Sequence, residues 1–189
     1  MESYHRTVQS KGILILLFLF CSCVSLKTPK RDDLVRLNAP MVIGKYPISS
    51  DRIFKTQLGN DTIVTDTIWG HFTDSNLKNR SNLLRSTHME LQLVDNKHLK
   101  SILYKGEIPL ETGVIKGRLR KGYFRTHNLS MTGVPPFYWT MDSSKMQIGT
   151  GKDGQLYIDS ANETSGSILI IGASTGGFTT SRVVPALTQ

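Results

Sequence analysis

The sequence predicts an all-β protein, a single antiparallel small barrel or sandwich with at most one short helix near residues 76–85. Many short segments are rich in β-branched residues or alternate between apolar and polar side chains, as strands do when one face is buried. Asp, Asn, Ser and Gly gather between these segments, where they favour tight turns. No long amphipathic helix is available to connect parallel strands, so we expect antiparallel pairing.

The clearest predicted hairpin covers residues 88–104. Met89, Leu91 and Leu93 alternate along its first strand, which places all three side chains on one face. A turn at residues 95–97 then leads into the returning strand. The other expected strands are residues 61–70, 112–119, 122–127, 137–141, 145–149, 155–159 and 167–172, and the other expected turns are residues 120–122, 142–144, 152–154 and 162–166.

By composition the chain divides into a signal peptide at residues 1–22, a tether at 23–50, a β domain at 51–175 and a loose C-terminal tail at 176–189. The start of the tether is charged, contains Pro and lacks apolar periodicity, so it has little surface to bury. Residues 41–43 can still add an edge strand. Residues 182–184 can be partly ordered within the Thr-, Ser- and Gly-rich tail.

The amino-terminal residues have the pattern of a secretory signal. A positive head with Arg6 and Lys11 precedes an uninterrupted apolar run at residues 13–20. The wider apolar stretch ends at Leu26. It is too short to span a bilayer comfortably, because a transmembrane helix needs about 20 residues.

The segment Phe20-Cys21-Ser22-Cys23 resembles the lipobox of bacterial lipoprotein precursors, in which Leu, a small residue and Gly or Ala precede the lipidated Cys. Phe20 stands where Leu is usual. The resemblance implies cleavage between Ser22 and Cys23 and acylation of Cys23, with Cys21 as the rival acceptor. An ordinary cleaved signal and an uncleaved anchor are the alternatives.

This resemblance also implies a location. Bacterial lipoproteins carry two acyl chains, such as palmitate, on the Cys thioether and usually a third on the new amino terminus. Two or more chains anchor a protein stably, whereas one does not. We therefore expect a lipid-anchored protein of the cell envelope. Ser25 is not the Asp that retains lipoproteins in the inner membrane of enteric bacteria, which favours the outer membrane, with the leaflet left open.

The chain is basic, with a formal net charge of +8 that falls to +7 once residues 1–22 are removed. Export argues against a nucleic acid as the partner of this charge. We interpret the densest basic cluster as the outward face of a strand, because its members alternate with apolar residues. The alternative is docking onto anionic lipid or glycan at the membrane surface. The cluster consists of Lys116, Arg118, Arg120, Lys121 and Arg125.

Large aromatic side chains stand at Trp69 and at Phe137, Tyr138 and Trp139. In a small β domain such rings usually fill the core, which is what we expect here. The alternative is that they line a cleft and contact an apolar or sugar ligand.

The β-rich body loosely resembles small uncharacterised lipoproteins of Bacteroidota and lipocalin-like envelope proteins. The lipocalin motif is Gly-x-Trp, whereas Gly70 follows Trp69 in this chain. The second resemblance implies a carrier of a small apolar ligand.

Signals for catalysis are weak. Ser174 lies between Gly172 and Gly176 with the spacing of a hydrolase elbow, but neither a helix nor a His follows it. The histidines lack metal-binding spacing, so we expect no metal and no other cofactor. We therefore expect a non-enzymatic envelope lipoprotein with a structural or interaction role. Its expected partners are the membrane and, in addition, another envelope protein or an anionic glycan or lipid. A lipocalin-like carrier is the first alternative and an envelope hydrolase the second.

Overall fold

The computed structural model describes residues 26, 29–55, 61–73, 80–134, 137–168, 171–174 and 177–187. Its described strands form antiparallel sheets, which confirms the predicted all-β class. The largest sheet has the order β12-β11-β10-β9-β8, with β1 added to β10 and β13 to β11. Its strands are β1 (Leu34–Val35), β8 (Arg118–Arg120), β9 (Tyr123–Val134), β10 (Tyr138–Gly151), β11 (Leu156–Ile168), β12 (Ile171–Ser174) and β13 (Phe178–Val184).

A second sheet has the order β2-β5-β6-β7, and β3 pairs with β4. These strands are β2 (Met41–Tyr46), β5 (His88–Leu93), β6 (His98–Lys105), β7 (Ile108–Lys116), β3 (Ser49–Lys55) and β4 (Asp61–Thr67). The described strands form open sheets, so the fold is a sandwich rather than a barrel.

The predicted hairpin at residues 88–104 is confirmed as β5 and β6. Met89, Leu91 and Leu93 are all buried, as their alternation predicts. The carboxylate of Asp95 holds the turn, because it accepts hydrogen bonds from the backbone N–H groups of Lys97 (2.6 Å) and His98 (2.8 Å).

The core lies between the inner faces of the two larger sheets. Phe124, Ile148 and Ile158 stand in one row across β9, β10 and β11, and all are buried. Leu91 and Leu99, from the facing sheet, belong to the same core cluster. Because alternate residues of each strand point inward, one face of each sheet supplies this core.

A short turn adds to the core from outside the two sheets. It contains the 3₁₀ helix η1 (Trp69–His71), and Trp69 and Phe72 are buried in the core cluster. The buried hydroxyl of Ser101 donates a hydrogen bond of 2.8 Å to the carbonyl of Phe72. Gly113 also meets this turn, since a Cβ at that position would lie 2.6 Å from the Phe72 carbonyl oxygen.

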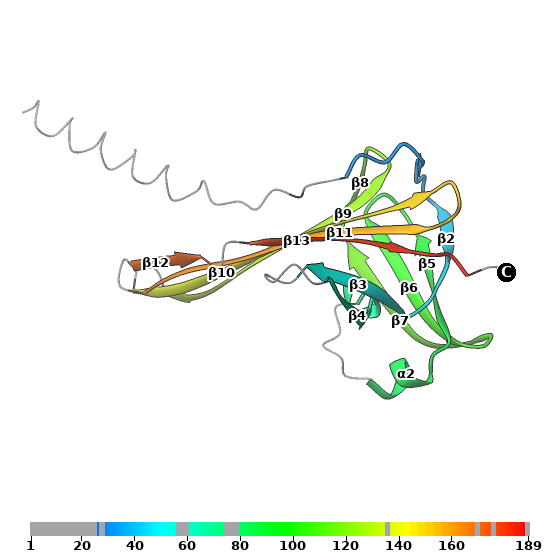
Figure 1. Cartoon of the computed structure of the whole chain (residues 1–189), viewed down its shortest axis with the longest axis horizontal. Helices are drawn as coiled ribbons and strands as arrows, with labels where there is room; N and C mark the ends of the chain where they lie inside the picture. The colour runs from blue at the N-terminus through cyan, green and yellow to red at the C-terminus, as the bar shows by residue number, and fades with distance from the viewer. Residues whose placement is uncertain are drawn as a thin grey trace, which may run out of the picture.

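The distal halves of β9, β10 and β11 leave the body together with β12 as a long arm (Figure 1). The predicted turns at residues 142–144 and 162–166 are therefore wrong, because β10 and β11 run through both of them. Turn-forming residues are accommodated here because neighbouring strands satisfy the backbone and the side chains bond across strands. Thr164, for example, donates a hydrogen bond of 2.7 Å to Asp142.

The tether predicted for residues 23–50 is too long. Arg31 is clamped to the body, β1 and β2 pair with the two larger sheets, and Leu37 is buried in the core. The edge strand expected at residues 41–43 is confirmed as part of β2. Composition alone missed the clamp, because a single Arg with a buried partner needs no apolar pattern around it.

The tail predicted to be loose is also ordered at residues 178–184. These residues form β13, which pairs antiparallel with β11. Val184 is fully buried, so the order expected at residues 182–184 is confirmed and extends further along the chain. β-Branched Thr and Val residues suit a strand, which offsets the Gly-rich composition just before them.

The expected helix is present as α2 (Arg80–Arg85), while residues 76–79 lie outside the described part of the chain. The predicted signal peptide at residues 1–22 and the predicted acylation site Cys23 also lie outside it. Within the described ranges, no helix is long and apolar enough to cross a membrane.

Candidate functional site

A polar groove lies where the arm joins the body, and strand register creates it. The buried row of Phe124, Ile148 and Ile158 continues outward along the same face of the sheet. The next row contains Thr126, Met146 and Ser160, and the row beyond it contains Asn128, Ser144 and Asn162. Core side chains thus give way to hydroxyls and carboxamides within two rows.

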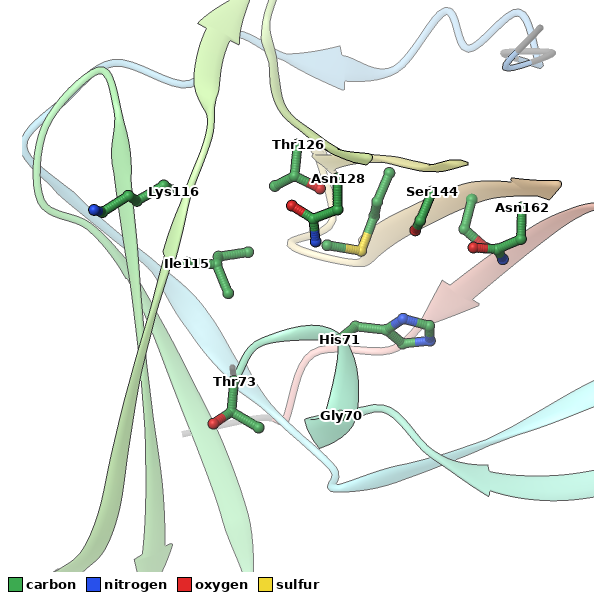
Figure 2. Close-up of a pocket in the computed structure, with 11 residues that line it drawn as sticks. Gly70, His71, Thr73, Ile115, Lys116, Thr126, Asn128, Ser144 and Asn162 are labelled. Carbon is green, nitrogen blue, oxygen red and sulfur yellow. The ribbon is translucent and has the colours of Figure 1, made fainter. Parts of the chain in front are cut away.

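The turn after β4 forms the opposite wall. His71 projects from this turn toward Ser144 and Asn162, and Gly70 and Thr73 lie beside it (Figure 2). The enclosed space measures about 350 Å³. It is lined by Gly70, His71, Thr73, Ile115, Lys116, Thr126, Asn128, Ser144, Met146, Ser160 and Asn162.

A second hollow of about 310 Å³ adjoins the first and shares Gly70, His71, Ser160 and Asn162 with it. The two hollows are therefore neighbours, and together they are here named the His71 groove. The second hollow is completed by Asp66, Thr67, Phe178, Thr180 and Arg182.

Arg182 is the least satisfied polar residue of this groove. Its side chain is only 4% exposed, and its Nη2 donates a hydrogen bond of 2.8 Å to Asp66. Its Nε and Nη1 are buried and have no hydrogen-bond partner among the described residues. A buried donor without an acceptor costs roughly 1–3 kcal/mol, so these two atoms lower the stability of the fold at this point.

The lining combines three kinds of group. Asn128 and Asn162 offer both donors and acceptors, and the Ser and Thr hydroxyls do the same. Asp66 offsets the charge of Arg182, so the pair is close to neutral overall. Phe178 adds an aromatic ring that is 60% exposed. Such a lining can hold a neutral, hydroxyl-rich ligand by many hydrogen bonds.

A clamp holds the amino-terminal segment on the other face of the same sheet. Arg31 donates two hydrogen bonds to Asp159 (2.7 and 2.8 Å) and lies 4.1 Å from the ring centre of Tyr157. The hydroxyl of Tyr157 donates to Asp33. Bidentate geometry of this kind is among the stronger ion-pair arrangements.

The clamp shifts the pKa values of its members. Burial raises the pKa of Asp159, but hydrogen bonds from Arg31, Gln147 and Ser181 outweigh burial and hold it below its usual range. The hydrogen bond to Asp33 raises the pKa of Tyr157 to about 12. Both shifts favour the charge states that keep the clamp closed at neutral pH.

The predicted aromatic residues do not meet at one site. Trp69 is buried in the core, as expected. Phe137 and Tyr138 are 63% and 57% exposed near the end of the arm, so the prediction that they fill the core is wrong for both. Trp139 is half-buried next to them. These three residues lie beyond the body, where none of the other described sheets covers them.

The basic cluster is not the face of a single strand, because Lys116 ends β7 in one sheet whereas Arg118 and Arg120 lie on β8 in the other. The predicted alternation of charged and apolar positions is nevertheless present. Ile115 is buried and Leu119 is half-buried between the charged positions. Arg125 differs, because it is half-buried with its guanidinium 5.9 Å from the ring centre of Tyr123. The exposed members are Lys116, Arg118, Arg120 and Lys121.

Sequence reasoning missed the groove residues His71, Asn128, Asn162 and Arg182. The composition of residues 162–166 predicts a turn, whereas these residues belong to the continuous strand β11. Within the described ranges, no cluster of three or more His, Cys, Asp or Glu side chains could hold a metal ion.

Comparisons with known proteins add no relative. A scan against protein-family models finds no match, and searches of curated proteins and of solved structures find no significant match.

Proposed function

We propose that this protein is a lipid-anchored component of the cell envelope that works by binding, and that its His71 groove holds a short saccharide of an envelope glycan. The anchor rests on the lipoprotein-like segment ending at Cys23. The observation that carries the binding role is the groove itself, which is lined by carboxamides and hydroxyls and includes the ion pair of Arg182 with Asp66.

The charge beside Arg182 favours a neutral ligand over a strong anion at that part of the groove. Asp66 accepts a hydrogen bond from Arg182 at 2.8 Å and would repel a phosphate or carboxylate placed beside it. Sugar hydroxyls both donate and accept, which matches Asn162 and Ser160 as well as Arg182 and Asp66. The exposed ring of Phe178 offers a flat apolar surface to the C–H face of a sugar ring.

The dimensions of the groove fit a short ligand. Small-molecule pockets usually measure ~300–1,000 Å³, and the larger hollow lies at the low end of this range. A carrier of an apolar ligand is less well supported, because most of the lining side chains are polar and Trp69 lies in the core instead.

Neighbouring serines on β10 provide a matched test. Ser144 lines the groove, whereas Ser143 points to the opposite face of the same strand. The full-length protein, solubilised in detergent, is applied to an array of bacterial envelope oligosaccharides. We expect retention of at least one oligosaccharide by the wild type and by Ser143→Leu, and at least a tenfold loss in Ser144→Leu, because the added side chain fills the groove.

Two outcomes would contradict this proposal. One is that no oligosaccharide is retained by the wild type. The other is that Ser144→Leu and Ser143→Leu bind alike, which would place any binding outside the groove.

A further inference from the structure

We propose that the end of the arm docks into the interfacial layer of the same bilayer that holds the acylated amino terminus. This inference names a second contact surface, distinct from the His71 groove, and it rests on the lipid anchor of the proposed function. The arm tip is defined here as Val134, Phe137, Tyr138, Trp139, Ile168 and Ile171.

The distal arm carries almost no charge, although 20% of the whole chain is charged. No Asp, Glu, Lys or Arg occurs from Asn128 to Met141 or from Thr164 to Ser181. Burying the arm tip therefore requires no desolvation of charged side chains, which would otherwise be the main cost of contact with lipid.

Both faces of the distal arm carry apolar side chains. On one face, Tyr138 pairs with Val134 and Ile168, and Ile168 pairs with Ile171. These four side chains are between 53% and 79% exposed. The opposite face carries Leu129, Met131, Trp139 and Met141, with Met131 paired to Met141. A protein partner seated on one face would leave the other in water, whereas lipid can surround both.

The sheet edge limits how deep the arm can go. Among the described strands, β8 covers only residues 123–125 of β9, so the outer edge of β9 is unpaired along the arm. Unpaired backbone groups do not enter the hydrocarbon layer. The aromatic side chains of Tyr138 and Trp139 are of the kind that gathers at the membrane–water interface. Both points place the arm tip at the interface rather than in the centre of the bilayer.

The anchor keeps the arm within reach of the membrane. Arg31 is clamped eight positions after Cys23, and this length of chain can extend by about 26–29 Å at most. The arm extends by about 31 Å from Gln147, which pairs with the clamped Asp159, to Tyr138, at ~3.4 Å per residue. These two lengths are similar, so an acylated Cys23 and the arm tip can contact one bilayer together.

Tryptophan fluorescence tests this docking directly. The full-length acylated protein is reconstituted into phosphatidylethanolamine–phosphatidylglycerol vesicles that contain phospholipid brominated near the headgroup. Bromine quenches tryptophan only at short range, and Trp69 is shielded in the core. We expect quenching in the wild type and its loss in Trp139→Phe, which removes the reporter.

A charge at the arm tip supplies the decisive variant. Ile171→Asp should abolish the quenching of Trp139, because a carboxylate at the tip opposes contact with lipid. Val114→Asp is the matched control, because Val114 is an exposed apolar residue of β7 in the other sheet, away from the arm. In Val114→Asp the fluorescence of Trp139 should be quenched as strongly as in the wild type.

Flotation of the vesicles distinguishes two failures: that the arm does not dock to lipid, and that the protein carries no lipid anchor. If the wild type floats with vesicles but Trp139 is not quenched, the anchor stands and arm docking is overturned. If the wild type does not float, the anchor fails, and a shared bilayer fails with it. If quenching is absent and cross-linking captures a dimer that Ile171→Asp abolishes, the partner of the arm is a second copy of this chain, which also overturns docking to lipid.

Discussion

Burial at single positions depends on what lies opposite each strand. Trp69 and Phe137 are both large aromatic residues flanked by apolar neighbours, yet one is 3% exposed and the other 63%. Trp69 stands on a turn that packs into the core cluster, whereas Phe137 stands on the arm, which none of the other described sheets covers. Residue type alone could therefore not separate core from exposed surface.

The Arg31–Asp159 pair should make stability depend on pH. The pKa of Asp159 is lower in the folded protein than the value of about 3.9 for an unperturbed Asp. A depressed pKa contributes stability above the unfolded value, and this contribution is lost as the pH falls through the folded value. Asp159→Asn should thus lower the urea midpoint of unfolding at pH 7. The difference in midpoint between this variant and the wild type should be smaller at pH 3.

Asp32 provides the control for this prediction. Its side chain is 89% exposed and lies 3.9 Å from Lys30, a geometry that contributes little. Asp32→Asn should unfold at the same urea concentration as the wild type at both pH values. A difference in midpoint for Asp159→Asn that is unchanged between pH 7 and pH 3 would refute the role assigned to the clamp.

At the level of elements, alternation predicted the strands of the body better than those of the arm. β5 is identifiable because one face is buried and the other is solvated. The arm has two solvent-facing sides, so Asp142–Ser144 and Asn162–Gly166 showed only turn-forming composition and no alternation. The same misinterpretation hid the groove, since Asn128, Ser144 and Asn162 align only when β10 and β11 are continuous.

Gly133 is predicted to be essential for the arm. Its φ is +112°, and a Cβ there would lie 2.4 Å from the carbonyl oxygen of Tyr138. Gly133→Ala should therefore increase the hydrogen exchange of arm amides in β9 and β10, while amides of β5 and β6 stay protected.

Gly172 is the matched control within the arm. It has no left-handed φ, and a Cβ there would meet its nearest neighbour at an ordinary 3.7 Å. Gly172→Ala should leave hydrogen exchange close to that of the wild type. Equal exchange in the two variants would mean that the strain at Gly133 is not what shapes the arm.

For the whole molecule, the sequence predicts a location in the cell envelope and a fold class, whereas the groove and the clamp are visible only in the structure. The lipoprotein-like signal is a pattern of consecutive residues, so it can be identified in residues 1–23 without knowing the fold. The groove and the clamp depend on pairs such as Arg182 with Asp66 and Arg31 with Asp159, which lie more than 100 residues apart. Such contacts follow from topology and cannot be inferred from local spacing.

The central claim is that this protein works while held on a membrane by Cys23. Metabolic labelling with a radioactive fatty acid tests it most directly. We expect label in the wild type and in Cys21→Ala, and none in Cys23→Ala, which should remain an uncleaved precursor. Label that persists in Cys23→Ala, or a wild type without label, would contradict the account.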